Sequence, residues 1–155
     1  MIINTIGTQA HNAQSFFDLL EQHSIERVID IRRRNTAQVC GVFTKANLAY
    51  LVPLIAPACL SSRRTYEHRL DLAPPMELLA AWHRKEIKWD VYTRRMERHL
   101  LDANPVYYEM DTQNAFRERR TVLLCSEHKP EHCHRSIVAE WVQRTCPHKV
   151  EIVNL

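Results

Sequence analysis

The sequence predicts a single α/β domain over residues 1–155, with a mainly parallel sheet of about five strands and helices on both faces. Short apolar segments rich in Ile and Val alternate with segments of helical periodicity along the whole chain. No hairpin-turn dipeptide joins two successive strand-like segments, so the strands are expected to be linked by crossover helices. A chain of 155 residues is also long enough to bury one hydrophobic core.

The expected strands are short; most are rich in β-branched or leucine residues, and the segment 65–70 is predicted from its alternation instead. They cover residues 2–6, 28–31, 65–70, 121–125 and 150–153. Gly7 follows the first of them and predicts a turn.

The helices between these strands are predicted from capping residues and apolar spacing. We expect a first helix after Ser15, with Asp18 three residues later as in a capping box. Thr44 is expected to cap a second helix that ends or kinks near Pro53. Further helices are expected after Pro74-Pro75, along an apolar stripe at Trp89, Tyr92, Met96 and Leu100, and from Ser136 to about Arg144.

Composition limits the classes of protein to which this chain can belong. It is 45% hydrophobic and 25% charged, which is typical of a globular protein. No apolar run approaches the roughly 20 residues of a membrane-spanning helix, and the N-terminus does not resemble a signal peptide. Five cysteines, an odd number, favour reduced thiols and a cytoplasmic location. With only two glycines, the chain contains no phosphate-binding glycine loop, and its net charge of +3 favours no particular partner or oligomeric state.

Polar and ionisable residues follow the expected strands, at the end of the sheet where ligands bind in parallel α/β folds. Because parallel strands end together, we expect these side chains to lie close to one another. They are Gly7 after the first strand, Asp30 and Arg32 after the second, His68 on the third, Cys125 and Glu127 after the fourth, and Cys133, His134 and Arg135 at the start of the next helix.

The two cysteines Cys125 and Cys133 could serve two chemistries. A thiol at a helix N-terminus beside an arginine favours its thiolate form, so either cysteine could be a nucleophile, with Glu127 as acid or base. Alternatively, Cys125, His128, His132, Cys133 and His134 could hold zinc or iron. Buried structural thiols are the third interpretation.

The arginines suggest an anionic partner. Arg135 on the first turn of a helix is suited to phosphate or carboxylate, and its loss is then expected to cost little stability. The alternative is a buried structural partner of Glu127 or Asp30, whose loss would be strongly destabilising. Asp30 and Arg32 point the same way along their strand, either as a buried pair or as substrate-binding groups. The runs Arg33-Arg34, Arg63-Arg64 and 117–120 could instead follow a nucleic-acid backbone.

Several of these motifs together resemble one known family. The opening Thr5-Ile6-Gly7, the strand ending Asp30-Ile31-Arg32, and LLCSEHKPEHCHRSIVAEW followed by VEIVNL resemble the domain of unknown function 488 family over nearly the whole chain. The resemblance implies a Rossmann-like fold and no established reaction. The positions that match the family's motif are Gly7, Asp30, Arg32, Cys125, Glu127, Pro130, Cys133, His134 and Arg135.

Three functions therefore remain open. The first is an enzyme for a small anionic or nucleotide-like substrate, in which Cys125, Glu127 and Cys133 are catalytic and Gly7, Asp30, Arg32, His68, His134 and Arg135 bind the substrate. The second is a non-catalytic module that binds a nucleotide or nucleic acid. The third is a metal-binding domain that uses the Cys/His cluster. The sequence identifies no cofactor.

Overall fold

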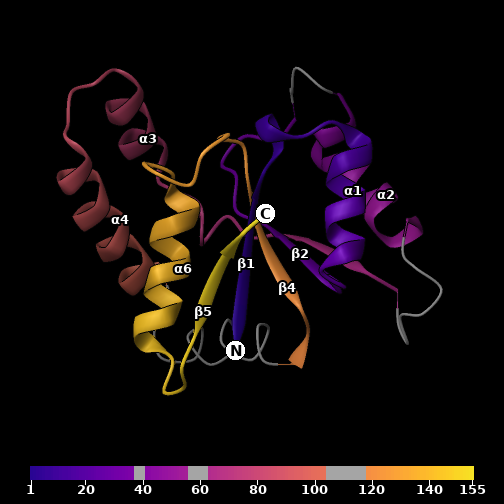
Figure 1. Cartoon of the computed structure of the whole chain (residues 1–155). Coiled ribbons are helices and arrows are strands. Elements are labelled where there is room, and N and C mark those ends of the chain that lie inside the picture. The colour runs from indigo at the N-terminus through magenta and orange to yellow at the C-terminus, as the bar shows by residue number, and fades with distance from the viewer. Residues whose placement is uncertain (37–40, 56–62, 104–117) are drawn as a thin grey trace.

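The computed structural model describes residues 1–36, 41–55, 63–103 and 118–155. Its centre is an all-parallel sheet of five strands in the order β3-β2-β4-β1-β5, as Figure 1 shows in part. The strands are β1 (Ile2–Gly7), β2 (Arg27–Asp30), β3 (Thr65–His68), β4 (Thr121–Cys125) and β5 (Glu151–Asn154). The predicted α/β fold with a parallel sheet is therefore confirmed.

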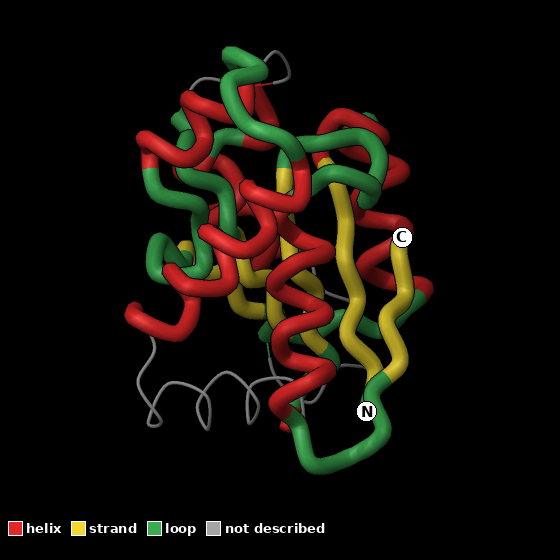
Figure 2. The backbone as a smooth tube through the Cα atoms, turned by 90° about the vertical axis from the view of Figure 1, so that its left-hand side faces the viewer, coloured by secondary structure: helices red, strands yellow, loops and turns green. Residues whose placement is uncertain are grey.

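Helices cover both faces of this sheet, as predicted. The α-helices are α1 (Ala13–Gln22), α2 (Lys45–Leu54), α3 (Met76–His83), α4 (Trp89–Ala103) and α6 (His134–Thr145), with short 3₁₀ turns η1 (Thr8–Ala10) and η2 (Gly41–Phe43). Helices α1 and α2 lie on one side of the strands, and α3, α4 and α6 lie on the other (Figure 1). Turned by 90°, the structure presents this second group of helices in front of the strands (Figure 2).

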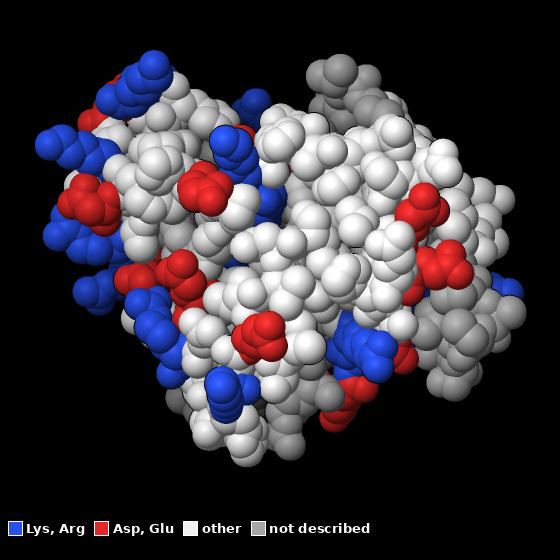
Figure 3. Space-filling view, in the orientation of Figure 1, with Lys and Arg blue, Asp and Glu red and all other residues white. Residues whose placement is uncertain are grey.

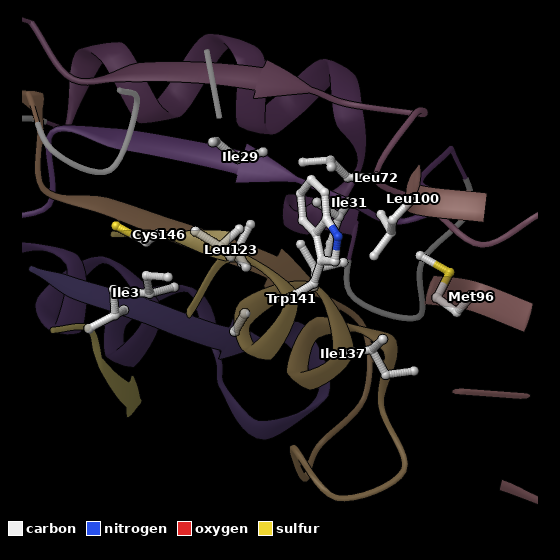
Figure 4. Packing of buried hydrophobic residues seen from close by; sticks show 14 of the residues in the cluster. Ile3, Ile29, Ile31, Leu72, Met96, Leu100, Leu123, Ile137, Trp141 and Cys146 are labelled. Carbon is white, nitrogen blue, oxygen red and sulfur yellow. The ribbon is translucent and has the colours of Figure 1, made fainter. Parts of the chain in front are cut away.

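The core consists of two apolar clusters, one on each face, because successive strand residues point to opposite sides. On the α4/α6 face, Ile3, Ile29 and Leu123 of the strands pack with Trp141 of α6 (Figure 4). On the α1/α2 face, Val28, Val122 and Leu124 belong to the second cluster, with Phe16 of α1. The apolar stripe on α4 is core as predicted, since Tyr92, Met96 and Leu100 are buried.

Several predicted boundaries differ from the structure. Helix α1 is capped by Asn12 and not by Ser15: the Asn12 side chain accepts from the Ser15 amide at 2.8 Å, and the Ser15 hydroxyl accepts from the Asn12 amide at 3.1 Å. Helix α2 agrees with its prediction, since Thr44 caps it and it ends at Leu54, one residue after Pro53. Strand β3 ends at His68, and α6 begins two residues before the predicted Ser136.

The strand ends are aligned at the carboxyl end of the sheet, which places the predicted site residues in a row. Gly7 of β1 is in register with Cys125 of β4, and Asp30 of β2 is in register with both His68 of β3 and Leu124 of β4. Neighbouring strands are about 4.8 Å apart. Gly7, Cys125, Asp30 and His68 therefore follow one another across four adjacent strands.

Gly7 is required by sterics, because a Cβ atom there would overlap the Glu127 carbonyl oxygen and the Arg135 guanidinium. We expect Gly7→Ala to lower the free energy of unfolding by about 1–3 kcal/mol, as overpacking in a tight interior does. Urea denaturation would measure the change. Gly41→Ala is the matched control, since nothing lies within 4 Å of a Cβ at that position. Equal stability of the two variants would contradict this account.

Candidate functional site

The predicted site residues form two separate groups at the carboxyl end of the sheet. One group surrounds Asp30 and Arg32, and the other surrounds Cys125, Cys133 and His134. Asp30 shares the side of β2 with Val28, in the α1/α2 cluster, whereas Cys125 alternates with Leu124 and so points to the α4/α6 face. The two groups therefore lie toward opposite faces of the sheet.

Asp30 and Arg32 form a buried ion pair, which is one of the two interpretations that the sequence allowed. The guanidinium donates from Nε to Oδ1 at 2.8 Å and from Nη2 to Oδ2 at 2.6 Å, and both side chains are at most 1% exposed. Asn35 and Tyr66 also donate to Oδ2, at 3.0 and 2.5 Å. His68 is hydrogen-bonded to the Arg32 carbonyl at 2.9 Å.

These partners change the ionisation of the Asp30 group. Burial alone would raise the pKa of Asp30, but the hydrogen bonds and charge of Arg32, together with Tyr66 and Asn35, hold it below its ordinary value of 3.8. Burial and the charge of Asp30 raise the pKa of Tyr66, so its hydroxyl keeps its proton and remains a donor. Every described contact of the Asp30 carboxylate stabilises the charged form, which suits a structural anion better than a base.

The second group brings together two thiols and an imidazole. Cys125 ends β4, Cys133 is the N-cap residue of α6, and His134 opens that helix. The Sγ atoms of Cys133 and Cys125 are 3.3 Å apart, and Cys125 Sγ lies 3.6 Å from His134 Nδ1. The residues are 1%, 1% and 8% exposed in chain order. The structure leaves both cysteines as free thiols.

The main chain fixes the orientation of the His134 ring. Its Nε2 lies 2.9 Å from the carbonyl oxygen of Ile31, just after β2. Because a carbonyl can only accept, Nε2 carries the proton and donates it to this oxygen. Cys125 Sγ lies 3.6 Å from Nδ1 and 3.7 Å from Nε2, so it contacts the ring between the two nitrogens. With Nε2 engaged by the carbonyl, Nδ1 is the nitrogen left for another partner. A histidine that binds a metal commonly has its other nitrogen held in this way.

The three groups also shift one another's ionisation. Burial raises the pKa of Cys125, but the hydrogen bond from Cys133 and the positive charge of His134 outweigh burial and bring it well below its ordinary value. Burial lowers the pKa of His134, whereas the neighbouring Cys125 raises it, and the net shift is upward. The hydrogen bond to Cys125, together with burial, raises the pKa of Cys133. Cys125 is therefore the more acidic thiol of the pair, and Cys133 donates the hydrogen bond to it.

Arg135 is buried and binds the main chain. It is 1% exposed, and its Nη1 donates to the carbonyl of Glu127 at 2.6 Å while Nη2 donates to that of His128 at 3.4 Å. Sequence reasoning expected its loss to cost little stability. Its burial favours the alternative, a structural arginine, but its partners are main-chain carbonyls and not the side chains of Glu127 or Asp30. Removing the guanidinium would leave two loop carbonyls without their donor.

Glu127, His128 and His132 do not join the described thiol cluster. The three side chains are exposed, and the group of potential metal ligands comprises only Cys125, Cys133 and His134 among the residues that the structure describes. His132 adopts a left-handed backbone conformation (φ 59°), and its ring packs edge-on against Trp89 at 5.1 Å. It lines a surface hollow of about 400 Å³ beside the loop that precedes Cys133.

The arginine runs have largely structural contacts where they are described. Arg33 donates to the Pro74 carbonyl at 2.7 Å, and Arg64 is buried and donates to the Ile25 carbonyl at 2.7 Å. Arg117 lies outside the described residues. In the view of Figure 3, exposed Lys and Arg side chains gather over α3 and α4 together with acidic ones, as in the pairs Arg84–Glu86 and Arg94–Asp90.

The predicted site left out three residues near the two groups. Asn35 and Tyr66 complete the hydrogen bonds of Asp30. Tyr92 lies near the cysteines, because burial and then the charges of Cys125 and Cys133 raise its pKa. Tyr66 stands two residues before His68 on the same strand, so both side chains point to the same face of the sheet. That shared face was the one signal in the sequence that could have indicated Tyr66.

The class of protein follows from these observations: a Rossmann-like α/β domain with a buried Cys/Cys/His cluster at the carboxyl end of its sheet. The model of the family described as domain of unknown function DUF488 matches residues 12–142. The chain therefore belongs to the DUF488 family, as the resemblance predicted. No curated protein and no solved structure matches the chain. Among the described helices, none combines the length and the apolar character needed to cross a membrane.

The Asp30–Arg32 pair gives a stability prediction. We expect Asp30→Asn to cost about 3–5 kcal/mol of unfolding free energy, because it leaves the buried Arg32 charge without a counterion. Asp90→Asn, which removes an exposed partner of Arg94, should cost less than about 1 kcal/mol. Urea titrations at pH 7 would measure both values.

The same pair has a defined pH dependence. Since the folded pKa of Asp30 lies below 3.8, its contribution is complete above that value and is lost as the pH falls through the folded pKa. The difference in unfolding free energy between wild type and Asp30→Asn should therefore stay constant down to pH 3.8. It should become smaller only below that pH. A difference under 1 kcal/mol at pH 7 would contradict the role of the pair.

Proposed function

We propose that this protein binds a transition metal ion, most simply Zn²⁺, through Cys125, Cys133 and His134. The observation that carries the proposal is that three buried donor atoms from these residues all lie within 4.8 Å of one another. Thiolate and imidazole are the donors that zinc prefers in proteins.

The distances support a tetrahedral ion. With Zn–S bonds of about 2.3 Å and a Zn–N bond of about 2.0 Å, two sulfur ligands are about 3.8 Å apart and a sulfur and a nitrogen about 3.6 Å apart. The Cys125–His134 separation of 3.6 Å matches, and the two sulfur atoms at 3.3 Å need to separate by only about 0.5 Å. With Nε2 held by the Ile31 carbonyl, Nδ1 is the ring nitrogen left to bind an ion.

Three protein ligands leave a fourth position for water or a substrate, which is the pattern of catalytic zinc sites. The surface hollow lined by Trp89, Pro130, Glu131 and His132 adjoins the loop that ends at Cys133. None of the three ligands lines that hollow itself.

A second candidate function is thiol chemistry on a small anionic substrate. The lowered pKa of Cys125, with Cys133 as proton donor and His134 as counterion, is the observation that favours it. Burial weighs against it, because Cys125 is 1% exposed and a nucleophile must reach its substrate. A buried set of converging donors is better explained by an ion.

Metal analysis tests the first candidate. Protein purified without chelators or a histidine tag should contain about one metal equivalent per chain, and chelation should lower its melting temperature. Cys125→Ser and His134→Gln should reduce the content at least tenfold. Cys146→Ser is the matched control, since Cys146 is also buried but is not among the ligand group, and it should retain the metal. A wild-type protein that takes up no zinc even after reconstitution would overturn the proposal.

Alkylation distinguishes the second candidate. If Cys125 is a nucleophile, iodoacetamide at pH 6 should modify it in native protein much faster than it modifies Cys146, because only a thiol with a lowered pKa is ionised at that pH. Mass spectrometry of the peptides measures both rates. If Cys125 binds zinc instead, bound zinc should slow the alkylation of Cys125, and removal of the zinc should restore the faster rate. Equal, slow modification with and without zinc would exclude thiol chemistry.

A further inference from the structure

A second polar region lies at the carboxyl end of β1, where the segment after β1 meets the loop after β4. The Gln9 amide donates to the Ser126 carbonyl at 2.9 Å. The Arg135 guanidinium donates to the next carbonyl, that of Glu127, and occupies the space that a side chain at Gly7 would need. Residues 7–11, 126–128 and Arg135 thus form one contact region.

Three buried polar atoms of this region have no hydrogen-bond partner in the part of the chain that the structure describes. They are Oγ1 of Thr8, Nε2 of His11 and Nε of Arg135. Thr8 is 2% exposed and Arg135 is 1% exposed. Buried side-chain polar atoms almost always have a partner, so three such atoms in one region indicate that an acceptor or bound group belongs there.

The region is also electropositive. Burial lowers the pKa of His11, a hydrogen bond to the Leu155 backbone raises it, and the charges of Arg135 and His128 lower it again. The net shift lowers the pKa of His11, which favours its neutral ring, so the fixed positive charge of the region is that of the Arg135 guanidinium. Arg135 lies on the first turn of α6, where main-chain N–H groups and the helix dipole also favour negative charge.

We propose that a phosphate or phosphoryl group binds at Thr8, His11 and Arg135. A tetrahedral oxyanion offers acceptors in several directions, so it can accept from the Thr8 hydroxyl and from Arg135 Nε–H at once. His11 Nε2 donates to it when the ring is charged, and it accepts from the hydroxyl of a monohydrogen phosphate when the ring is neutral. The anion accepts from Nε of Arg135, while Nη1 and Nη2 of the same guanidinium donate to the carbonyls of Glu127 and His128.

This site is separate from the proposed metal centre. It uses none of the three metal ligands, and the proposal does not depend on a metal being bound. The sequence indicated Arg135 as an anion-binding residue, and the structure adds Thr8 and His11 to it.

Calorimetric titration with inorganic phosphate tests the proposal, with sodium chloride matching the ionic strength. The wild-type chain should bind phosphate saturably at one site. Thr8→Val removes the hydroxyl and keeps the side-chain shape, and Arg135→Lys keeps the charge and removes Nε. Each should weaken binding at least tenfold. Arg64→Lys is the matched control, because Arg64 is also buried with an unpartnered nitrogen but precedes β3, at the opposite end of the sheet, and it should bind phosphate as the wild type does.

Circular dichroism confirms that each variant is folded, and Thr8→Val decides the outcome if Arg135→Lys is not. The absence of saturable phosphate binding to the wild type would overturn the proposal, as would unchanged affinity in Thr8→Val or an equal loss in Arg64→Lys. Adenosine monophosphate in the same titration separates the two sources of the anion. Tighter binding than inorganic phosphate assigns the site to the phosphoryl group of a nucleotide, and weaker binding assigns it to free phosphate.

Discussion

The close approach of α6 to the end of β1 determines how the loops are arranged at the carboxyl end of the sheet. Arg135 extends from the first turn of α6 across Gly7 and holds the carbonyls of Glu127 and His128. This contact sets the path of the loop that connects Cys125 to Cys133. Glycine is needed at position 7 because the guanidinium and the loop carbonyl occupy the volume of any larger side chain.

The two faces of the sheet carry different groups of polar residues. On the α1/α2 face, Asp30 and Arg32 neutralise each other, and Tyr66 and Asn35 satisfy the remaining oxygen positions. That network holds the segment after β2 in place. On the α4/α6 face, the thiols and His134 contact one another without enclosing an acid partner of their own. The buried ion pair therefore stabilises the strand end beside the Cys/Cys/His cluster. The donor atoms of that cluster, unlike those of the ion pair, remain able to bind a further group.

The fold was predictable from the sequence, but the partners of the polar groups were not. The strands ending at Asp30 and Cys125 follow from β-branched and leucine runs, and their shared end follows from parallel pairing. The start of α1 was misplaced because Asn12 and Ser15 are both good capping residues. A buried structural Arg135 was one interpretation of the sequence, but its partners could not be foreseen, because they are main-chain carbonyls, which every residue carries. The contact of His134 with Ile31 spans 103 positions in the chain, and no local pattern encodes it.

That last contact has a consequence for how the protein is made. The carbonyl that decides which ring nitrogen of His134 carries its proton belongs to the segment after β2, which leaves the ribosome about a hundred residues earlier. Chains begin to fold from the N-terminus during synthesis. The acceptor thus already exists when the cysteine-containing loop emerges, but β4 must insert between β1 and β2 before the ring can reach it. The oriented imidazole of His134 therefore forms only after β4 has paired with β2, and a chain stalled before that step carries its two thiols without it.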